Sequence, residues 1–75
     1  MAIITFTSDL GLKDYYVSAV KGAIYSQLPT ANVVDITHLI PTFNLLEAAY
    51  ILKNAYSNFP KGTIHVVAVK AESSK

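Results

Sequence analysis

The sequence has 75 residues, of which 52% are hydrophobic and 15% are charged, and its formal net charge is +1. This apolar composition excludes intrinsic disorder, and the weak charge excludes a nucleic-acid partner held by electrostatics. The absence of cysteine excludes disulfide frameworks, thiolate zinc sites and thiol nucleophiles. A chain this short buries only about 60% of its unfolded surface. The apolar excess therefore predicts part of a larger protein or an oligomer.

The sequence contains no membrane-spanning or export signal. No run of about 20 apolar residues occurs, and the apolar start Ile3 to Phe6 has no basic residue before it and reaches Asp9 too soon for a signal peptide. We therefore expect a cytoplasmic protein without a membrane partner.

The first half of the chain has the pattern of a strand, a helix and a second strand. Ala2 to Thr7 is rich in β-branched and aromatic residues, which is typical of a buried strand, and a turn-like stretch follows it. From Asp14 to Leu28 the apolar residues have helical spacing, and Pro29 ends this segment. A second β-branched run, Asn32 to Ile36, predicts the next strand.

The second half repeats the pattern. Asn44 followed by Glu47 resembles a capping box and marks the start of a second helix. The apolar face of that helix comprises Leu45, Ala48, Ala49, Leu52, Ala55 and Tyr56. Turn-forming residues up to Gly62 end the helix, and Thr63 to Val69 predicts a third strand.

Strand, helix, strand, helix and strand at this spacing predict an α/β fold with an open parallel sheet of the three-layer type. Two right-handed crossovers in the same direction place both helices on one face of the sheet, and we expect that arrangement. The other face and a sheet edge then lack cover, which predicts further sequence after Lys75 in the intact protein.

Ligands of open α/β sheets bind beyond the carboxyl ends of the strands, where two carboxylates follow the first strand. Asp9, beside Gly11 in a tight turn, either closes its own Asx-turn or accepts two hydrogen bonds from a vicinal diol. Spacing alone favours the turn. Asp14 is either the cap of the first helix or the partner of a ligand ammonium group, and composition favours the cap.

Other side chains at this end carry weaker signals. His38 is a general base, a metal ligand or a donor that tethers its loop, and we favour the tether because no second metal ligand stands at the required spacing. Phe43 either stacks on a planar ring or belongs to a hydrophobic staple. His65 fits a packed strand residue. Ser8 lies outside any G-x-S-x-G motif, and phosphate-binding glycine loops are missing.

Several segments together resemble one family over about Ile3 to Val69, the S-adenosylmethionine hydroxide adenosyltransferases, which are related to fluorinase and chlorinase. In chain order these segments are Thr7-Ser8-Asp9-Leu10-Gly11, Asp14 with Tyr16-Val17, Lys21-Gly22, Val34-Asp35-Ile36-Thr37-His38, Ile40-Pro41 and Phe59-Pro60-Lys61-Gly62-Thr63-Ile64-His65. The resemblance implies that residues 1–75 are part of an N-terminal S-adenosylmethionine-binding domain, without the family's C-terminal domain.

The resemblance also implies an activity. Water, hydroxide or a halide displaces methionine at the ribose C5′ of S-adenosylmethionine, giving adenosine or a 5′-haloadenosine. Asp9 then binds the ribose hydroxyls, Asp14 contacts the methionine amino group and Phe43 lies near the substrate, while Ser8, Gly11 and His38 support the loops. S-adenosylmethionine is the substrate, and no separate cofactor or metal is implied. The intact protein is expected to be a homotrimer.

One segment departs from the family. Hydroxide-using members follow the third strand with an Asp-Pro-Gly-Val-Gly-like stretch, whereas this chain has Lys70-Ala71-Glu72-Ser73-Ser74. The catalytic residues therefore stay unassigned, with Glu72 or residues outside this sequence as substitutes, and we expect the isolated 75-residue chain to be inactive. The alternative is a non-catalytic α/β module that binds a nucleoside or serves in assembly.

Overall fold

The computed structural model describes residues 2–70. Its elements are β1 (Ile3–Ser8), α1 (Tyr16–Gln27), β2 (Asn32–Thr37), α2 (Leu45–Ala55), a short 3-10 turn η1 (Tyr56–Asn58) and β3 (Ile64–Ala68). This order confirms the predicted α/β pattern. No end of a strand differs by more than one residue from its predicted position. The segment Ala71 to Lys75, which includes Glu72, lies outside the described residues.

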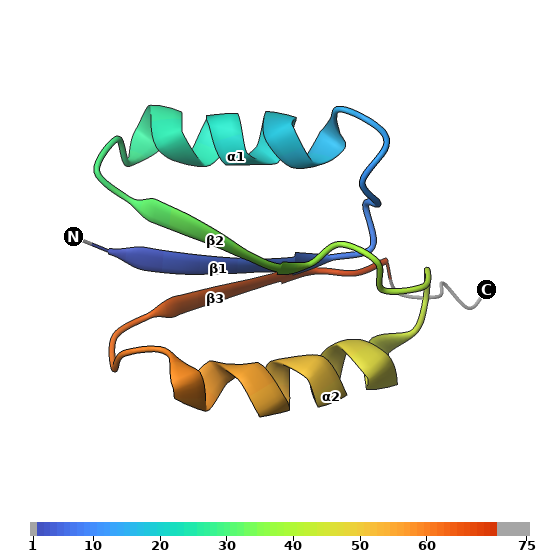
Figure 1. Cartoon of the computed structure of the whole chain (residues 1–75). Helices are drawn as coiled ribbons and strands as arrows, with labels where there is room; N and C mark the ends of the chain where they lie inside the picture. The colour runs from blue at the N-terminus through green and yellow to red at the C-terminus, as the bar shows by residue number, and fades with distance from the viewer. Residues whose placement is uncertain (1, 71–75) are drawn as a thin grey trace.

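The three strands form one parallel sheet in the order β2-β1-β3, with β1 in the centre. Thr5 of β1 lies opposite Val34 on one side and opposite His65 on the other. Because β1 has a strand on each edge and a helix over each face (Figure 1), all its residues from Ile4 to Ser8 are buried.

The two helices lie on opposite faces of the sheet, with α1 on one side and α2 on the other (Figure 1). Our expectation that both helices share one face is therefore wrong. The first crossover leads from β1 to β2 at one edge, whereas the second leads from β2 past β1 to the opposite edge. Since both crossovers have the usual right hand, reversing their direction moves the second helix to the other face. The switch in direction falls between β1 and β3.

The face beneath α1 is the apolar core. Ile4, Phe6 and Val33 are buried there, and the helix packs Val17, Val20 and Ile24 against them. These three helix residues belong to the stripe predicted from the sequence.

The face beneath α2 is more polar. β1 presents Thr5 and Thr7 to this side, and both are fully buried. Thr5 Oγ1 lies 2.7 Å from Nδ1 of His65, whose ring also forms T-shaped contacts with the rings of Tyr56 and Phe59. His65 is therefore a packed strand residue, as predicted.

Helix α2 begins at the predicted cap, Asn44, which pairs with Glu47. The Asn44 side-chain oxygen accepts a hydrogen bond from the Glu47 backbone N–H at 3.0 Å, and the Asn44 amide donates in return to the Glu47 carboxylate at 3.2 Å. The cap satisfies one of the unpaired N–H groups of the first helical turn. It thereby fixes where the loop after β2 ends.

A large apolar surface stays uncovered along β3. A groove of about 410 Å³ runs beside α1, and Ile4, Val20, Ile24, Ile64 and Val66 are among its lining residues. Ile64 is 51% exposed. The apolar excess seen in the composition is thus concentrated partly at this edge. Within residues 2–70, no helix combines the length and the apolar character needed to cross a membrane.

Candidate functional site

The loops after β1 and β2 are tied together at the carboxyl end of the sheet. The Gly11 N–H donates to the His38 carbonyl at 2.8 Å, and the Ile40 N–H donates to the Ser8 carbonyl at 3.3 Å. The side chains of Ser8 and His38 also meet, with 2.6 Å between Oγ and Nδ1. The three residues expected to support the loops, Ser8, Gly11 and His38, all take part in these contacts.

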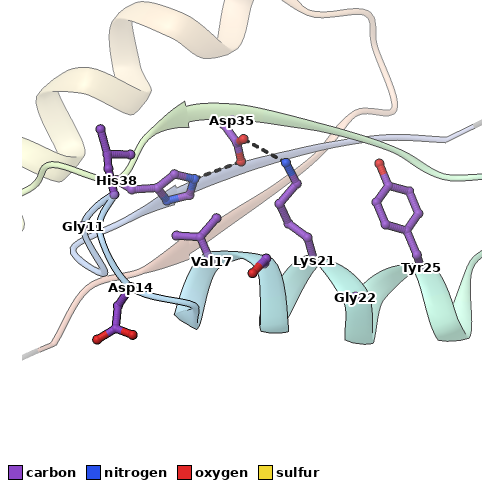
Figure 2. A pocket seen from close by; sticks show the side chains of 10 residues that line it. Gly11, Asp14, Val17, Lys21, Gly22, Tyr25, Asp35 and His38 are labelled. Carbon is purple, nitrogen blue, oxygen red and sulfur yellow. Dashed lines mark hydrogen bonds and ion pairs between the residues drawn. The ribbon is translucent and has the colours of Figure 1, made fainter.

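A chain of polar side chains continues from His38 to α1. His38 Nε2 lies 2.9 Å from Asp35 Oδ1, and Asp35 Oδ2 lies 2.9 Å from Lys21 Nζ (Figure 2). The ring of Phe6 packs edge-on against His38, with 4.7 Å between the ring centroids. His38 is therefore buried and bonded at both ring nitrogens.

The charge state of Asp35 follows from these partners. Burial acts to raise the pKa of the Asp35 carboxyl, but hydrogen bonds from His38 and Lys21, together with the charge of Lys21, outweigh it and hold this pKa below its usual value. Asp35 is thus an ionised acceptor at neutral pH.

The connectivity of Ser8, His38 and Asp35 resembles that of a nucleophilic triad. The Ser8 side chain, however, is fully buried, and its oxygen accepts a hydrogen bond from the Leu10 N–H at 3.2 Å. A serine nucleophile must reach its substrate, and this one is enclosed in its own turn. The arrangement therefore holds the loop in place and does not expose a reactive hydroxyl.

Asp9 lies at the switch point between β1 and β3. Its N–H donates to the Ala68 carbonyl at 3.3 Å, and its Oδ2 accepts from the Lys70 N–H at 2.9 Å. The Asx-turn that spacing favoured does not form, because the Gly11 N–H, which an Asp9 Asx-turn would use, donates to the His38 carbonyl instead. An ionised carboxylate has about four acceptor positions. Asp9 can therefore accept two ligand hydroxyls while it keeps the bond from Lys70.

Phe43 lies close to the same point, just before the cap of α2. Its ring is 49% exposed, and Lys70 Nζ lies 6.0 Å from the ring centroid. Lys70 thus connects the surroundings of Asp9 and Phe43. The backbone of Phe43 has φ 71°, a left-handed conformation that is unfavourable for a bulky L-residue.

Asp14 lies elsewhere, in the loop before α1. Its Oδ1 accepts only the N–H of Tyr15 at 2.9 Å among the described residues, and the helix starts at Tyr16, so Asp14 is not the N-cap. Asp14 lines an open groove of about 500 Å³ with Lys21, Asp35 and His38, but it points away from the Asp35–Lys21 pair (Figure 2). Asp9 and Phe43 do not line this groove.

Two residues of the network, Asp35 and Lys21, were not predicted as site residues. A signal for each is present in the sequence. Lys21 interrupts the apolar stripe of α1 between Val17 and Ile24, and Asp35 interrupts a β-branched strand three residues before His38. When two opposite charges occupy positions that should face the core, the pattern indicates that the two side chains pair with each other. Within residues 2–70, no three His, Asp or Glu side chains come together as metal ligands.

Comparison with known proteins places this arrangement in one family. Residues 4–75 match the SAM hydroxide adenosyltransferase N-terminal domain, SAM being S-adenosylmethionine. The chain is 38% identical over 69 residues to an (R)-S-adenosyl-L-methionine hydrolase of Thermus thermophilus, covering 92% of this chain and 27% of that protein. It is 37% identical over 62 residues to a fluorinase of Nocardia brasiliensis, covering 83% of this chain and 21% of the fluorinase.

The fold is shared as well. The crystal structure of an uncharacterized conserved protein from Thermotoga maritima superposes with a TM-score of 0.86 at 39% identity, covering 88% of this chain and 25% of that one. The chain therefore spans about a quarter of the length of the relatives that it matches.

The ion pair of Asp35 predicts an acid-dependent loss of stability. Because the folded-state pKa lies below the ordinary value of about 3.9, the contribution of Asp35 is complete above about pH 4 and is lost as the pH falls through the lower folded-state value. Urea unfolding between about pH 5 and pH 3 should therefore show a smaller loss of stability in Asp35→Asn than in the unmodified chain. If the free energy of unfolding fell equally with pH in the two proteins, the lowered pKa of Asp35 would be wrong.

The left-handed backbone of Phe43 predicts a stabilising substitution. Glycine adopts this conformation without the cost of about 1–2 kcal/mol that a side chain incurs. Since half of the ring is exposed, Phe43→Gly should leave the free energy of unfolding unchanged or raise it by about 1 kcal/mol. Phe43→Ala, which keeps the strained Cβ, is the control and should be less stable than Phe43→Gly in denaturant unfolding. The reverse order would show that the left-handed backbone at this position carries no such cost.

Proposed function

The chain belongs to the SAM hydroxide adenosyltransferase N-terminal domain family, and from this premise we propose that it supplies the ribose-binding half of an S-adenosylmethionine-cleaving site. In the complete enzyme, water, hydroxide or a halide displaces methionine from the ribose C5′. The products are methionine and adenosine, or a 5′-haloadenosine. The observation that carries the proposal is the position of Asp9 at the β1/β3 switch point, with acceptor positions left for a diol.

The proposed ribose contact follows from the geometry of Asp9. Bonds at its backbone N–H and at one carboxylate oxygen hold the residue against the end of β3. A carboxylate that is fixed in this way accepts both hydroxyls of a vicinal diol with little further loss of conformational entropy. Ser8, Gly11 and His38 support this role because they hold the turn on which Asp9 stands.

The other two contacts are assigned by the family's pattern and by position. Phe43 offers an exposed ring near Lys70, where a planar base can stack, and its strained backbone is typical of functional sites. Asp14 is an exposed carboxylate in the loop just before α1, and we propose that it binds the ammonium group of the methionine portion.

The reaction needs few catalytic groups. A sulfonium is a good leaving group that departs without protonation, so the protein has to hold C5′ in line with the nucleophile and exclude competing water. Asp9 and Asp14 serve orientation and neither attacks. We assign no catalytic residue to this chain, because Lys70 stands where the family resemblance places an aspartate that positions water.

The remaining parts of the proposal concern the whole protein. A homotrimer in the cytoplasm, with the C-terminal domain of a neighbouring subunit closing the site, would supply the walls that this chain lacks. The second candidate function is a non-catalytic nucleoside-binding or assembly module. It is favoured by Lys70 alone, which stands where the family resemblance places an aspartate that the reaction uses.

A chimera separates the two candidates. The matched segment of the Thermus thermophilus hydrolase is replaced by this chain, and methionine release from S-adenosylmethionine is measured by chromatography. We expect release by the chimera, and faster release by its Lys70→Asp variant. A folded chimera that binds adenosine but releases methionine only with Lys70→Asp would favour the module. If even the Lys70→Asp chimera neither binds adenosine nor releases methionine, the ribose-site proposal fails.

Two substitutions test the proposed contacts in the same chimera. Asp9→Asn should weaken adenosine binding by about 1.5–3 kcal/mol, which is the usual contribution of hydrogen bonds to a charged group. Asp14→Asn should weaken binding of S-adenosylmethionine and spare adenosine, because adenosine has no ammonium group. Calorimetric titration with both ligands measures the difference. An equal loss for both ligands in Asp14→Asn would contradict the assignment of Asp14.

A further inference from the structure

We propose that Asp35 and Lys21 are positioning residues that select one tautomer of His38 and thereby fix the turn carrying Asp9. Neither residue contacts the proposed ribose site. The structural part of this inference concerns the Ser8–Leu10 turn alone. Its consequence for ligand binding rests on the proposed function.

The direction of every hydrogen bond in the network follows from the charge of Asp35. An ionised carboxylate only accepts, so His38 Nε2 carries a hydrogen and donates it to Asp35. In the neutral ring Nδ1 is then bare, and it accepts the Ser8 hydroxyl hydrogen across 2.6 Å. The Ser8 oxygen keeps its lone pairs for the Leu10 N–H. The order of donation is Leu10 to Ser8 to His38 to Asp35, with Lys21 donating to Asp35 from the other side.

The alternative ring states fit the site poorly. With the hydrogen on Nδ1, the bare Nε2 lone pair would face the negative carboxylate of Asp35 at 2.9 Å. With hydrogens on both nitrogens, the Ser8 oxygen would accept from both His38 and Leu10, and its own hydrogen would lack this acceptor in a fully buried position. Only the Nε2–H tautomer satisfies all the polar atoms of the network.

Lys21 keeps Asp35 in the state that makes this selection. Its ammonium group lies 2.9 Å from Oδ2, and its side chain reaches the carboxylate from α1 on the opposite side to His38 (Figure 2). The pair is half-exposed, and its contribution to the free energy of unfolding is therefore small. Its contribution to orientation is larger, because Lys21 binds one carboxylate oxygen while His38 binds the other.

The effect reaches Asp9 through the backbone. Asp9 lies between Ser8 and Leu10, the two residues that the turn hydrogen bond joins. Its carboxylate is held at β3 by the Lys70 N–H. A change in the Ser8 turn therefore rotates the backbone of Asp9 while one carboxylate oxygen stays attached, which tilts the oxygens proposed to bind the ribose.

The test is imidazole and amide nuclear magnetic resonance on the 75-residue chain. Long-range proton–nitrogen spectra should show His38 of the unmodified chain as the Nε2–H tautomer. In Asp35→Asn, whose amide can donate as well as accept, we expect a mixture of tautomers, and protection of the Leu10 amide from exchange should fall roughly two- to tenfold. Lys21→Met should change both signals in the same direction, and Lys21→Arg should restore them.

Lys53→Met is the matched control, because it removes an exposed lysine from α2 and should change neither signal. An Nδ1–H tautomer in the unmodified chain overturns the inference. So does an unchanged His38 spectrum with unchanged Leu10 protection in both Asp35→Asn and Lys21→Met. Should Asp35→Asn fail to fold, the two Lys21 variants decide the question.

Adenosine binding by the chimera separates this inference from the proposed function. In the chimera, Asp35→Asn should reduce adenosine affinity several-fold without a comparable loss of thermal stability. If Asp9→Asn lowers the affinity and Asp35→Asn does not, the positioning role is wrong and the ribose assignment stands. If neither substitution lowers the affinity, the ribose assignment is wrong, and the spectroscopic result alone decides the role of Asp35.

Discussion

The hydrogen bond between Ser8 and His38 is the contact on which the carboxyl end of the sheet depends. It joins the last residue of β1 to the loop after β2, and it is buried from solvent on both sides. Backbone hydrogen bonds from the Gly11 and Ile40 N–H groups join the same two loops, so these loops are held together by three contacts. Because an unpaired polar atom in this position would be costly, the contact also restricts which ring state and which turn the chain can adopt.

The secondary structure could be predicted from the sequence because local signals agree with the fold. The β-branched and aromatic run and the helical spacing of apolar residues locate β1 and α1, and Asn44 with Glu47 locates the start of α2. The placement of the helices could not be predicted in this way. Handedness is fixed for each crossover, but local patterns do not specify which edge of β1 receives the third strand, and that choice decides which face α2 covers.

The same distinction between local signals and tertiary arrangement applies to the candidate site residues. Asp9, Phe43 and His38 could be proposed from the sequence because they follow strand ends or precede a helix, and position in the fold makes such loops candidates. The partners of these residues were harder to find. Asp9 bonds to Lys70, which is 61 residues away, and Lys21 meets Asp35 across 14 residues. Such contacts depend on strand order and helix packing, which neither spacing nor composition specifies.

The switch point gives the two carboxylates of the first loop different surroundings. Asp9 is held at the end of β3 through its backbone N–H and one carboxylate oxygen, and this restraint suits the ribose contact that we propose for it. Asp14 has solvent around it and one short-range bond, so it can adjust to a flexible ammonium chain. A reaction governed by alignment at C5′ requires rigid contact near the reacting carbon and tolerates freedom at the leaving group. On the proposals above, the polar network from Lys21 to Ser8 places the rigidity at Asp9, where such a reaction needs it.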